Sequence, residues 1–327
     1  MIIEWATEHW IQIFLISWVV LYNVWPQSRK ELGKQVVVIT GGAQGLGKQM
    51  GLLFAKEHAG ITLIIIDIQA QQGAETVTEI KSLSGLSSVY YLHCDLSDPA
   101  QLTTTWSQIT SRFGQVNILI NNAARALGKE FSTLTIDQYR KTIDINFLSI
   151  VHLTKLFTEQ EAVKESLVKG EYQLVNVNSI GSFMAQRQWS DYGASKFALR
   201  GFTQALRYEL NEELPNLVIT NIYPYHINTR MFEGFKPLIR KLIPSIDPVY
   251  AAQRIHRAIL YQEREVHIWW YLYYIRIILE LLPLSIQLFL VKHLIGQGMQ
   301  TFVGNQQKPY AGEESKQQQF KRAKKVQ

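Results

Sequence analysis

The 327-residue chain has a single cysteine and no site for N-linked glycosylation. One cysteine, Cys94, excludes a disulfide within the chain, and no group of cysteine and histidine residues has the spacing of a zinc site. No Asn-x-Ser/Thr triplet occurs anywhere in the sequence. These absences favour a reducing, unglycosylated compartment for most of the chain, and we expect no metal ion.

Charge is also scarce, since Asp, Glu, Lys and Arg make up only 18% of the residues. The net charge of +6 comes largely from two short basic clusters, at residues 29–34 and 316–325. Local clusters of this kind suit anionic lipid headgroups better than nucleic acid, which needs a basic stripe across a folded face. We therefore expect a membrane surface, and no nucleic acid, among the partners.

Long hydrophobic runs are confined to the two ends of the chain. Residues 10–25 carry no charge, have tryptophans at both edges and precede Pro26 and a basic flank, which predicts a membrane anchor with everything after it cytosolic. The run falls short of the roughly 20 apolar residues of a comfortable span, and it lacks the features of a cleaved signal peptide. A tilted span and a hairpin in one leaflet are both compatible with this pattern, and a buried helix is the less favoured alternative.

The second apolar stretch covers residues 266–299 and is interrupted by Arg276, Glu280 and Lys292. It predicts either aromatic-rich amphipathic helices in the membrane interface or a strand and helices that complete the core and cap the pocket. The polar sequence after Gly304 is typical of disorder. We predict four parts: a membrane anchor and basic flank (1–34), a catalytic domain (35–264), an apolar C-terminal extension (265–304) and a disordered basic tail (305–327).

The first part of the predicted catalytic domain alternates strand and helix patterns. Residues 36–39 form a β-branched run without polar alternation, which predicts a parallel strand buried on both faces. Residues 48–58 have helical spacing, and residues 61–66 predict a second buried strand that ends at Asp67. Strand, helix, strand and acid form the βαβ unit that binds a dinucleotide.

A glycine-rich loop joins the first predicted strand to the helix. Gly41, Gly45 and Gly47 give it the spacing Gly-x3-Gly-x-Gly. Glycines at these places let a pyrophosphate approach the helix N-terminus and its partial positive charge. The loop therefore predicts a dinucleotide cofactor.

Asp67 lies 20 residues after the last glycine of this loop. A carboxylate there can accept hydrogen bonds from the adenosine ribose and would repel a ribose phosphate. Gln44, Ile68 and Gln69 supply no cation for that phosphate, and Lys48 is the one nearby residue that favours it. We therefore expect NAD rather than NADP.

Two further segments are expected beside the cofactor. Asp95 follows the strand pattern that begins at Tyr90, and it could contact the adenine amino group or serve as the N-cap of the helix near Pro99, or both. Residues 117–120 predict the next strand, and the segment 121–124 closes it near the cofactor.

The strongest catalytic signal is Tyr192, with Lys196 four residues after it and Ser179 thirteen residues before it. An i,i+4 spacing on a helix places the ammonium near the phenol, where a positive charge lowers the phenol pKa toward neutrality. Such a tyrosine can exchange a proton with a substrate oxygen while a nicotinamide exchanges a hydride with the carbon. The pattern predicts a nicotinamide-dependent alcohol or carbonyl redox site.

In their order and spacing these motifs resemble the short-chain dehydrogenase/reductase family, from about residue 35 to about residue 248. The resemblance implies an α/β fold with a doubly wound (Rossmann) parallel sheet of about seven strands. It implies that Ser179 binds the substrate oxygen, that Tyr192 is the acid/base and that Lys196 binds the nicotinamide ribose. The remaining member of the implied catalytic tetrad, Asn146, orders a water next to Lys196. The implied cofactor-binding residues are Gly41, Gln44, Gly45, Leu46, Gly47, Asp67, Asp95, Leu96, Asn122, Ala123, Tyr192, Lys196, Pro224, Ile227 and Thr229.

The chain departs from the family pattern at two places. Ala124 replaces a usual glycine, which adds one methyl group near the cofactor. Tyr225 replaces the glycine of the usual Pro-Gly pair and puts a bulky ring near the nicotinamide and the substrate. We interpret the next residue, His226, as a pocket wall or surface residue rather than as a second acid/base.

The outer regions resemble a narrower group, the membrane-associated epidermal retinol dehydrogenases and their hydroxysteroid dehydrogenase relatives. The apolar N-terminus, residues 229–234, residues 250–259 and residues 282–284 carry this resemblance. It implies a hydrophobic retinoid-like or steroid-like substrate, an endoplasmic reticulum or lipid droplet location, and a homodimer. Two alternatives are an NADPH-dependent long-chain lipid ketoreductase and a non-catalytic, membrane-tethered NAD-binding scaffold. Residues 231–248 predict an amphipathic lid over the pocket or an ordinary surface helix.

Overall fold

The fold is built around one parallel sheet. The computed structural model describes residues 29–184, 186–235, 243–290 and 292. Seven parallel strands pair in the order β3-β2-β1-β4-β5-β6-β7. They are β1 (Val36–Thr40), β2 (Thr62–Asp67), β3 (Val89–His93), β4 (Ile118–Asn121), β5 (Gln173–Val177), β6 (Val218–Tyr223) and β7 (Glu265–His267). The predicted doubly wound parallel sheet is thereby confirmed.

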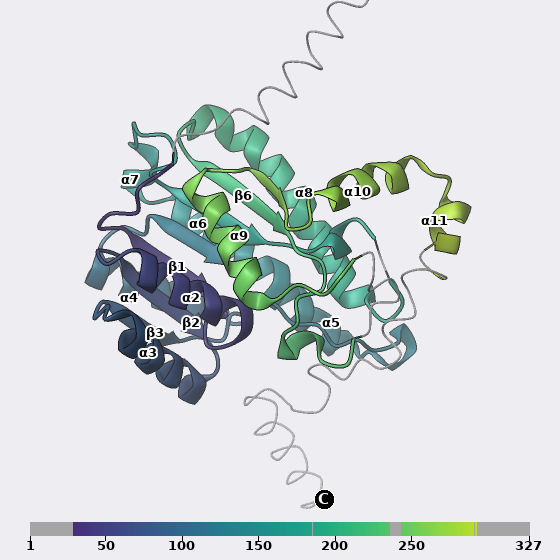
Figure 1. The fold of residues 1–327 in the computed structure, drawn as a ribbon, viewed down its shortest axis with the longest axis horizontal. Coiled ribbons are helices and arrows are strands. Elements are labelled where there is room, and N and C mark those ends of the chain that lie inside the picture. The colour runs from purple at the N-terminus through teal and green to yellow at the C-terminus, as the bar shows by residue number, and fades with distance from the viewer. Residues whose placement is uncertain (1–28, 185, 236–242, 291, 293–327) are drawn as a thin grey trace, which may run out of the picture.

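Helices cover both faces of the sheet (Figure 1). One face carries α2 (Gly45–Glu57), α3 (Ala70–Ser84) and α9 (Pro248–Leu260), and the other α4 (Pro99–Phe113), α6 (Ser149–Thr158) and α8 (Ser190–Glu213). The other helices are α5 (Ile136–Ile143), α7 (Glu161–Lys164), α10 (Tyr271–Leu281) and α11 (Leu284–Leu290). Short turns are η1 (Phe131–Thr133), η2 (Asp144–Leu148), η3 (Ile180–Ser182) and η4 (Arg230–Phe232).

Strand β1 shows why the sheet needs two helical layers. Val37 and Ile39 belong to the apolar core that includes α2 and α9, whereas Val36 and Val38 belong to the core that includes α4 and α6. Successive side chains of a strand point to opposite faces, so a strand covered on both sides is apolar throughout. This is the physical reason that an unbroken β-branched run predicted β1.

The start of α4 shows which aspartate is the N-cap of this helix. Asp98 is the N-cap, and its carboxylate accepts hydrogen bonds from the N–H groups of Ala100 (2.9 Å) and Gln101 (3.2 Å). Asp95 instead accepts from the N–H and hydroxyl of Ser97, at 2.9 and 2.7 Å. The interpretation of Asp95 as the N-cap is therefore wrong.

The apolar stretch near the C-terminus begins as part of the sheet. Strand β7 pairs with β6, with Asn221 opposite Glu265 and Tyr223 opposite His267. It therefore starts immediately after the predicted end of the catalytic domain at residue 264, and the four-part division of the chain stays a prediction. The same stretch continues as α10 and α11.

Several parts of the prediction fall outside the described residues. They are the apolar segment 10–25, the central part of the predicted lid (236–242) and the basic tail (305–327). Within the described ranges, no helix combines the length and the apolar character needed to cross a membrane.

Candidate active site

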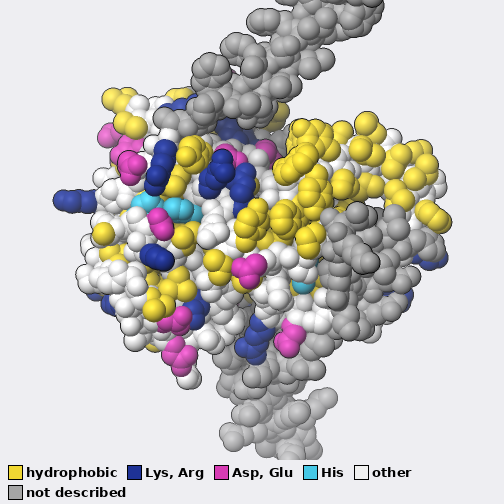
Figure 2. Space-filling model, in the orientation of Figure 1, with side chains coloured by type: hydrophobic (Ala, Val, Ile, Leu, Met, Phe, Trp, Pro, Cys, Tyr) yellow, Lys and Arg dark blue, Asp and Glu magenta, His cyan; other side chains and the backbone are white. Residues whose placement is uncertain are grey.

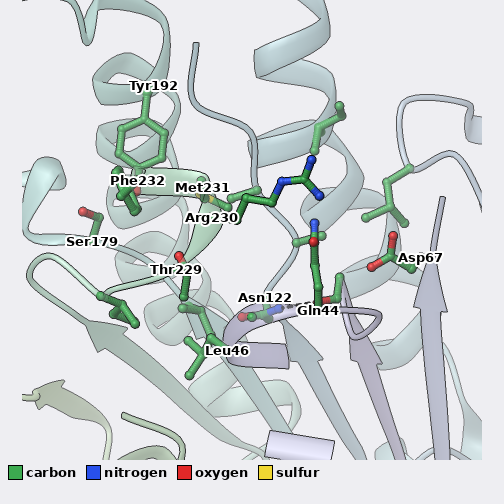
Figure 3. A pocket seen from close by; sticks show the side chains of 18 of the residues that line it. Gln44, Leu46, Asp67, Asn122, Ser179, Tyr192, Thr229, Arg230, Met231 and Phe232 are labelled. Carbon is green, nitrogen blue, oxygen red and sulfur yellow. Dashed lines mark hydrogen bonds between the residues drawn. The ribbon is translucent and has the colours of Figure 1, made fainter. Parts of the chain in front are cut away.

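A pocket lies where the carboxyl ends of β1, β2, β4, β5 and β6 meet (Figure 3). Parallel strands bring the loops that follow them to one edge of the sheet. Of the predicted site residues, those that line this pocket are Gly41, Gln44, Gly45, Leu46, Asp67, Asp95, Leu96, Asn122, Ala123, Ser179, Tyr192, Lys196, Pro224, Ile227 and Thr229. Gly47 and Asn146 are not part of the pocket lining.

The glycine loop forms a tight backbone cradle. Gly41 and Gly45 adopt left-handed φ values of 66° and 57°, which strain a residue that has a side chain. A Cβ atom on Gly47 would lie 2.2 Å from the carbonyl oxygen of Gly41, so no side chain fits there. The Asn122 amide group donates to the carbonyl oxygens of Thr40 (2.9 Å) and Gly41 (3.1 Å) and holds the loop in place.

The N-terminus of α2 opens into this cradle. Its N-cap residue, Gln44, makes no side-chain capping hydrogen bond, and the first turn contains no acidic residue. No carboxylate side chain in the first turn of α2 therefore competes for the backbone N–H groups at the start of the helix. Together with the close backbone approach at the glycines, this arrangement fits the pyrophosphate of a dinucleotide.

Asp67 stands at the carboxyl end of β2, on the wall of the pocket. Its carboxylate accepts hydrogen bonds from the N–H groups of Ala43 and Gln69, each at 3.0 Å. Burial raises the pKa of this carboxyl group, and the backbone hydrogen bonds oppose that shift. Lys48, which favoured a ribose phosphate, forms an ion pair with Glu79 at 2.6 Å and is not among the pocket residues.

Tyr192 lies in the first turn of α8 and is only 3% exposed. Its ring packs edge-on against the rings of Trp189 and Phe232, with centroids 5.3 and 6.1 Å away. Burial raises the pKa of Tyr192 to about 12, and a hydrogen bond with the Ser179 side chain works against the shift. Ser179 also accepts a hydrogen bond from the N–H of Gly181, at 2.9 Å.

Lys196 lies one turn further along α8 and is 1% exposed. Its ammonium group donates to the carbonyl oxygen of Val177 at 2.9 Å and lies 5.8 Å from the centroid of the Tyr192 ring. Burial lowers the pKa of Lys196 to about 7. The prediction of a lowered phenol pKa at Tyr192 is therefore wrong for this arrangement, because burial raises that pKa and the opposing contribution comes from the Ser179 hydrogen bond rather than from Lys196.

Asn146 occupies the π-helical turn η2 and is fully buried. Its side-chain oxygen accepts from the N–H of Arg125 (2.7 Å), and its amide group donates to the carbonyl of Arg125 (2.9 Å) and the hydroxyl of Ser195 (3.0 Å). These bonds tie the segment after β4 to α8. The side chain thus supports the helix that carries Tyr192 and does not itself enter the pocket.

Some pocket residues were not among the predicted site residues. Lys141 comes from α5, Ile145 from η2, and Met231 and Phe232 from η4. Their positions depend on how these short elements fold over the sheet edge. Lys141 and Ile145 belong to no motif, whereas Met231 and Phe232 lie in the segment 229–234 that carried the narrower family resemblance. Arg230 belongs to the same group.

Both departures from the family pattern lie in the pocket lining, whereas the residue after Tyr225 does not. Tyr225 lines the pocket, as predicted, and burial raises the pKa of its phenol to about 12. Ala124 also lines it. His226 does not: one ring nitrogen is 2.8 Å from the hydroxyl oxygen of Ser245, and the ring packs 4.8 Å from that of Phe235.

The glycine cradle can be tested through protein stability. We predict that Gly47→Ala lowers the free energy of unfolding by about 1–3 kcal/mol, because the new methyl group meets a backbone oxygen that cannot move aside. Gly201→Ala is the matched control, since a Cβ atom on this α8 residue meets nothing within 4 Å. Urea denaturation of both variants provides the measurement, and equal midpoints for the two would contradict the steric argument.

Comparison with known proteins agrees with this geometry. Residues 35–237 match the family model described as short chain dehydrogenase. Epidermal retinol dehydrogenase 2 of Mus musculus is 30% identical over 275 residues, which cover 84% of this chain and 86% of that protein.

Two solved structures share the fold. One is a short chain dehydrogenase/reductase from Burkholderia phymatum in complex with NAD, with 19% identity, a TM-score of 0.65, and coverage of 76% of this chain and 93% of that chain. The other, from Sphingobium yanoikuyae in complex with NADPH, has 20% identity, a TM-score of 0.64, and coverage of 80% and 97%. With the family-model match over residues 35–237, these findings place the chain in the short-chain dehydrogenase family.

Proposed function

We propose that this protein is an NAD-dependent oxidoreductase that transfers a hydride between the cofactor and the hydroxyl or carbonyl carbon of a hydrophobic, lipid-like substrate. The observation that carries the proposal is the single pocket in which Ser179, Tyr192 and Lys196 meet the glycine loop. The loop and Asp67 would hold the dinucleotide. When bound, its nicotinamide ring supplies the hydride donor or acceptor.

Tyr192 is the proposed acid and base. With a pKa of about 12 its phenol is protonated at neutral pH, so it can donate a proton to a developing alkoxide during carbonyl reduction. Ser179, which hydrogen-bonds with Tyr192, would orient the substrate oxygen. In the reverse direction the phenolate must form, and protonated Lys196, 5.8 Å from the Tyr192 ring, would stabilise it.

The walls around Tyr192 support a hydrophobic substrate. Tyr225, Met231 and Phe232 line the pocket, and Trp189 packs behind the tyrosine ring. Large apolar and aromatic walls with few polar groups favour a lipid-like molecule whose one oxygen is bound by Ser179 and Tyr192. The mouse relative is named a retinol dehydrogenase, which supports a retinoid as the first candidate. A steroid, which the family resemblance implied, is the second candidate.

We also propose that the protein contacts the surface of the endoplasmic reticulum membrane or of lipid droplets. Its catalytic domain would then lie in the cytosol. A broad apolar area covers α10 and α11 in Figure 2. Its most exposed side chains are Trp270 (71%), Leu281 (80%) and Leu284 (67%). A continuous exposed surface of apolar and aromatic side chains is typical of a membrane contact.

The charges of α10 do not interrupt this apolar area. Glu280 lies 3.5 Å from Arg276 of the same helix and 3.1 Å from Arg200 of α8. Arg276 also stacks on Phe183, 4.1 Å from the ring centroid. These side chains are used in contacts with the catalytic domain, so the outward side of α10 keeps its apolar character. The homodimer implied by the family resemblance stays a prediction.

The catalytic role of Tyr192 is tested with detergent-solubilised protein, NAD and a panel of all-trans-retinol, hydroxysteroids and long-chain secondary alcohols. We predict NADH production with at least one lipid alcohol and a loss of about 100-fold or more in Tyr192→Phe, with NAD affinity nearly unchanged. Tyr208→Phe, at an exposed tyrosine of the same helix, is the control. Full turnover in Tyr192→Phe contradicts the mechanism, and NAD binding without turnover on any substrate supports the scaffold alternative.

The cofactor preference is tested at Asp67. We predict that the unaltered protein binds NAD more tightly than NADP, and that Asp67→Asn narrows this preference about 10-fold, because it removes the charge that repels a ribose phosphate. Asp95→Asn, at the second acidic residue of the lining, is the control. Tighter binding of NADP by the unaltered protein would favour the NADPH-dependent ketoreductase instead.

The apolar surface of α10 and α11 is tested with a substrate held in lipid vesicles. We predict that a triple variant with serine at Trp270, Leu281 and Leu284 turns over vesicle-borne substrate several-fold more slowly, while the rate in detergent is unchanged. The control is a triple variant with serine at three other exposed apolar residues, Leu83, Phe131 and Leu167. Equal losses in both triple variants would count against a specific membrane contact.

A further inference from the structure

Arg230 is the first residue of η4 and lines the pocket beside the glycine loop. The preceding residue, Thr229, is extended, and its Cγ2 atom would lie 3.6 Å from a Cβ atom on Gly45. The backbone of Arg230 therefore starts close to the N-terminus of α2. In Figure 3 its side chain extends across the pocket, away from Tyr192 and toward the side where Gln44 lies.

Arg230 differs from the other basic residues of the pocket lining in its exposure and its contacts. The charged residues of the lining are Asp67, Asp95, Lys141, Lys196 and Arg230. Lys196 is buried and donates to a backbone carbonyl, and Lys141 comes from α5. Arg230 is exposed, and no carboxylate among the described residues forms an ion pair with it. Its guanidinium group is thus available to an anion that enters the pocket.

We propose that Arg230 binds the pyrophosphate of the dinucleotide, an inference that rests on the proposed function. At the glycine loop, the backbone N–H groups of the α2 N-terminus can donate to the phosphate oxygens. The planar guanidinium group offers two parallel N–H donors from η4, a geometry that matches phosphate oxygens. The anion is then held between two elements that are far apart in the sequence.

This assignment differs from a ribose-phosphate contact in a measurable way. NAD, NADP and ADP-ribose share the pyrophosphate, whereas only NADP carries a further phosphate on the 2′-oxygen of the adenosine ribose. Asp67 lies on the pocket wall where the adenosine ribose is expected, and it would repel such a phosphate. A pyrophosphate contact therefore contributes equally to the binding of all three ligands.

The test is the dissociation constant of each ligand, measured by isothermal titration calorimetry on the full chain in detergent. We expect Arg230→Ala to raise the dissociation constants of NAD, NADP and ADP-ribose by the same factor, about 10- to 100-fold. Arg230→Lys should lose less affinity for each ligand, because lysine keeps the positive charge but lacks the two parallel N–H donors of the guanidinium group. The loss in Arg230→Ala should shrink as salt is added. The control is Lys164→Ala, which removes one positive charge from the surface of α7.

Each other outcome overturns the inference in its own way. If Arg230→Ala binds NAD as tightly as the unaltered protein, the assignment is wrong while the proposed function stands. If NADP loses far more affinity than NAD, Arg230 contacts the ribose phosphate instead. If the unaltered protein binds none of the three ligands, the proposed function fails and the inference fails with it.

Discussion

The burial of the parallel sheet on both faces is the constraint from which the active site follows. Every residue of β1, β4, β5 and β6 is buried, so these strands have no surface on which a polar side chain could meet a substrate. The few polar residues inside the sheet bond to one another, as Asn121 does with Asn176 at 2.9 Å. Chemistry is consequently confined to the loops and helix N-termini beyond the carboxyl ends of the strands, and the parallel register brings those segments together.

Burial also governs the electrostatics of the site. It raises the pKa of Tyr192 and lowers the pKa of Lys196, so each group favours its uncharged form. A phenol and an amine in this state cost little to keep away from water. Charge that develops on the substrate oxygen or on Tyr192 during the reaction then meets the side chains of Ser179 and Lys196, which are already in place to stabilise it.

Much of this organisation could be predicted from the sequence because it depends on local chemistry. The β-branched runs predicted the inner strands, and the glycine spacing predicted the cradle, where Gly41 and Gly45 have left-handed φ values and Gly47 has no room for a Cβ atom. The spacing of Tyr192 and Lys196 placed both on one side of α8. These features need no knowledge of residues distant in the chain.

What the sequence did not disclose depends on tertiary packing. The phenol pKa was predicted in the wrong direction because the i,i+4 rule counts a neighbouring charge and not the depth of burial. Asp95 and Asp98 are chemically identical, and only the backbone geometry decides which of them caps α4. Arg230 and Lys141 reach the pocket through the fold of short elements, and neither was predicted as a site residue.

The π-helical turn η2 has a consequence for how this chain can change over evolution. It holds one residue more than an α-helical turn would, between α5 and α6. Substitutions that keep its length preserve the direction in which Asn146 faces. Deletion of one residue would convert the wide turn into an α-helical turn and merge α5 with α6, and the residues within it, Asn146 among them, would shift relative to Arg125 and Ser195. The segment 144–148 should therefore vary in composition among descendants of this gene but not in length.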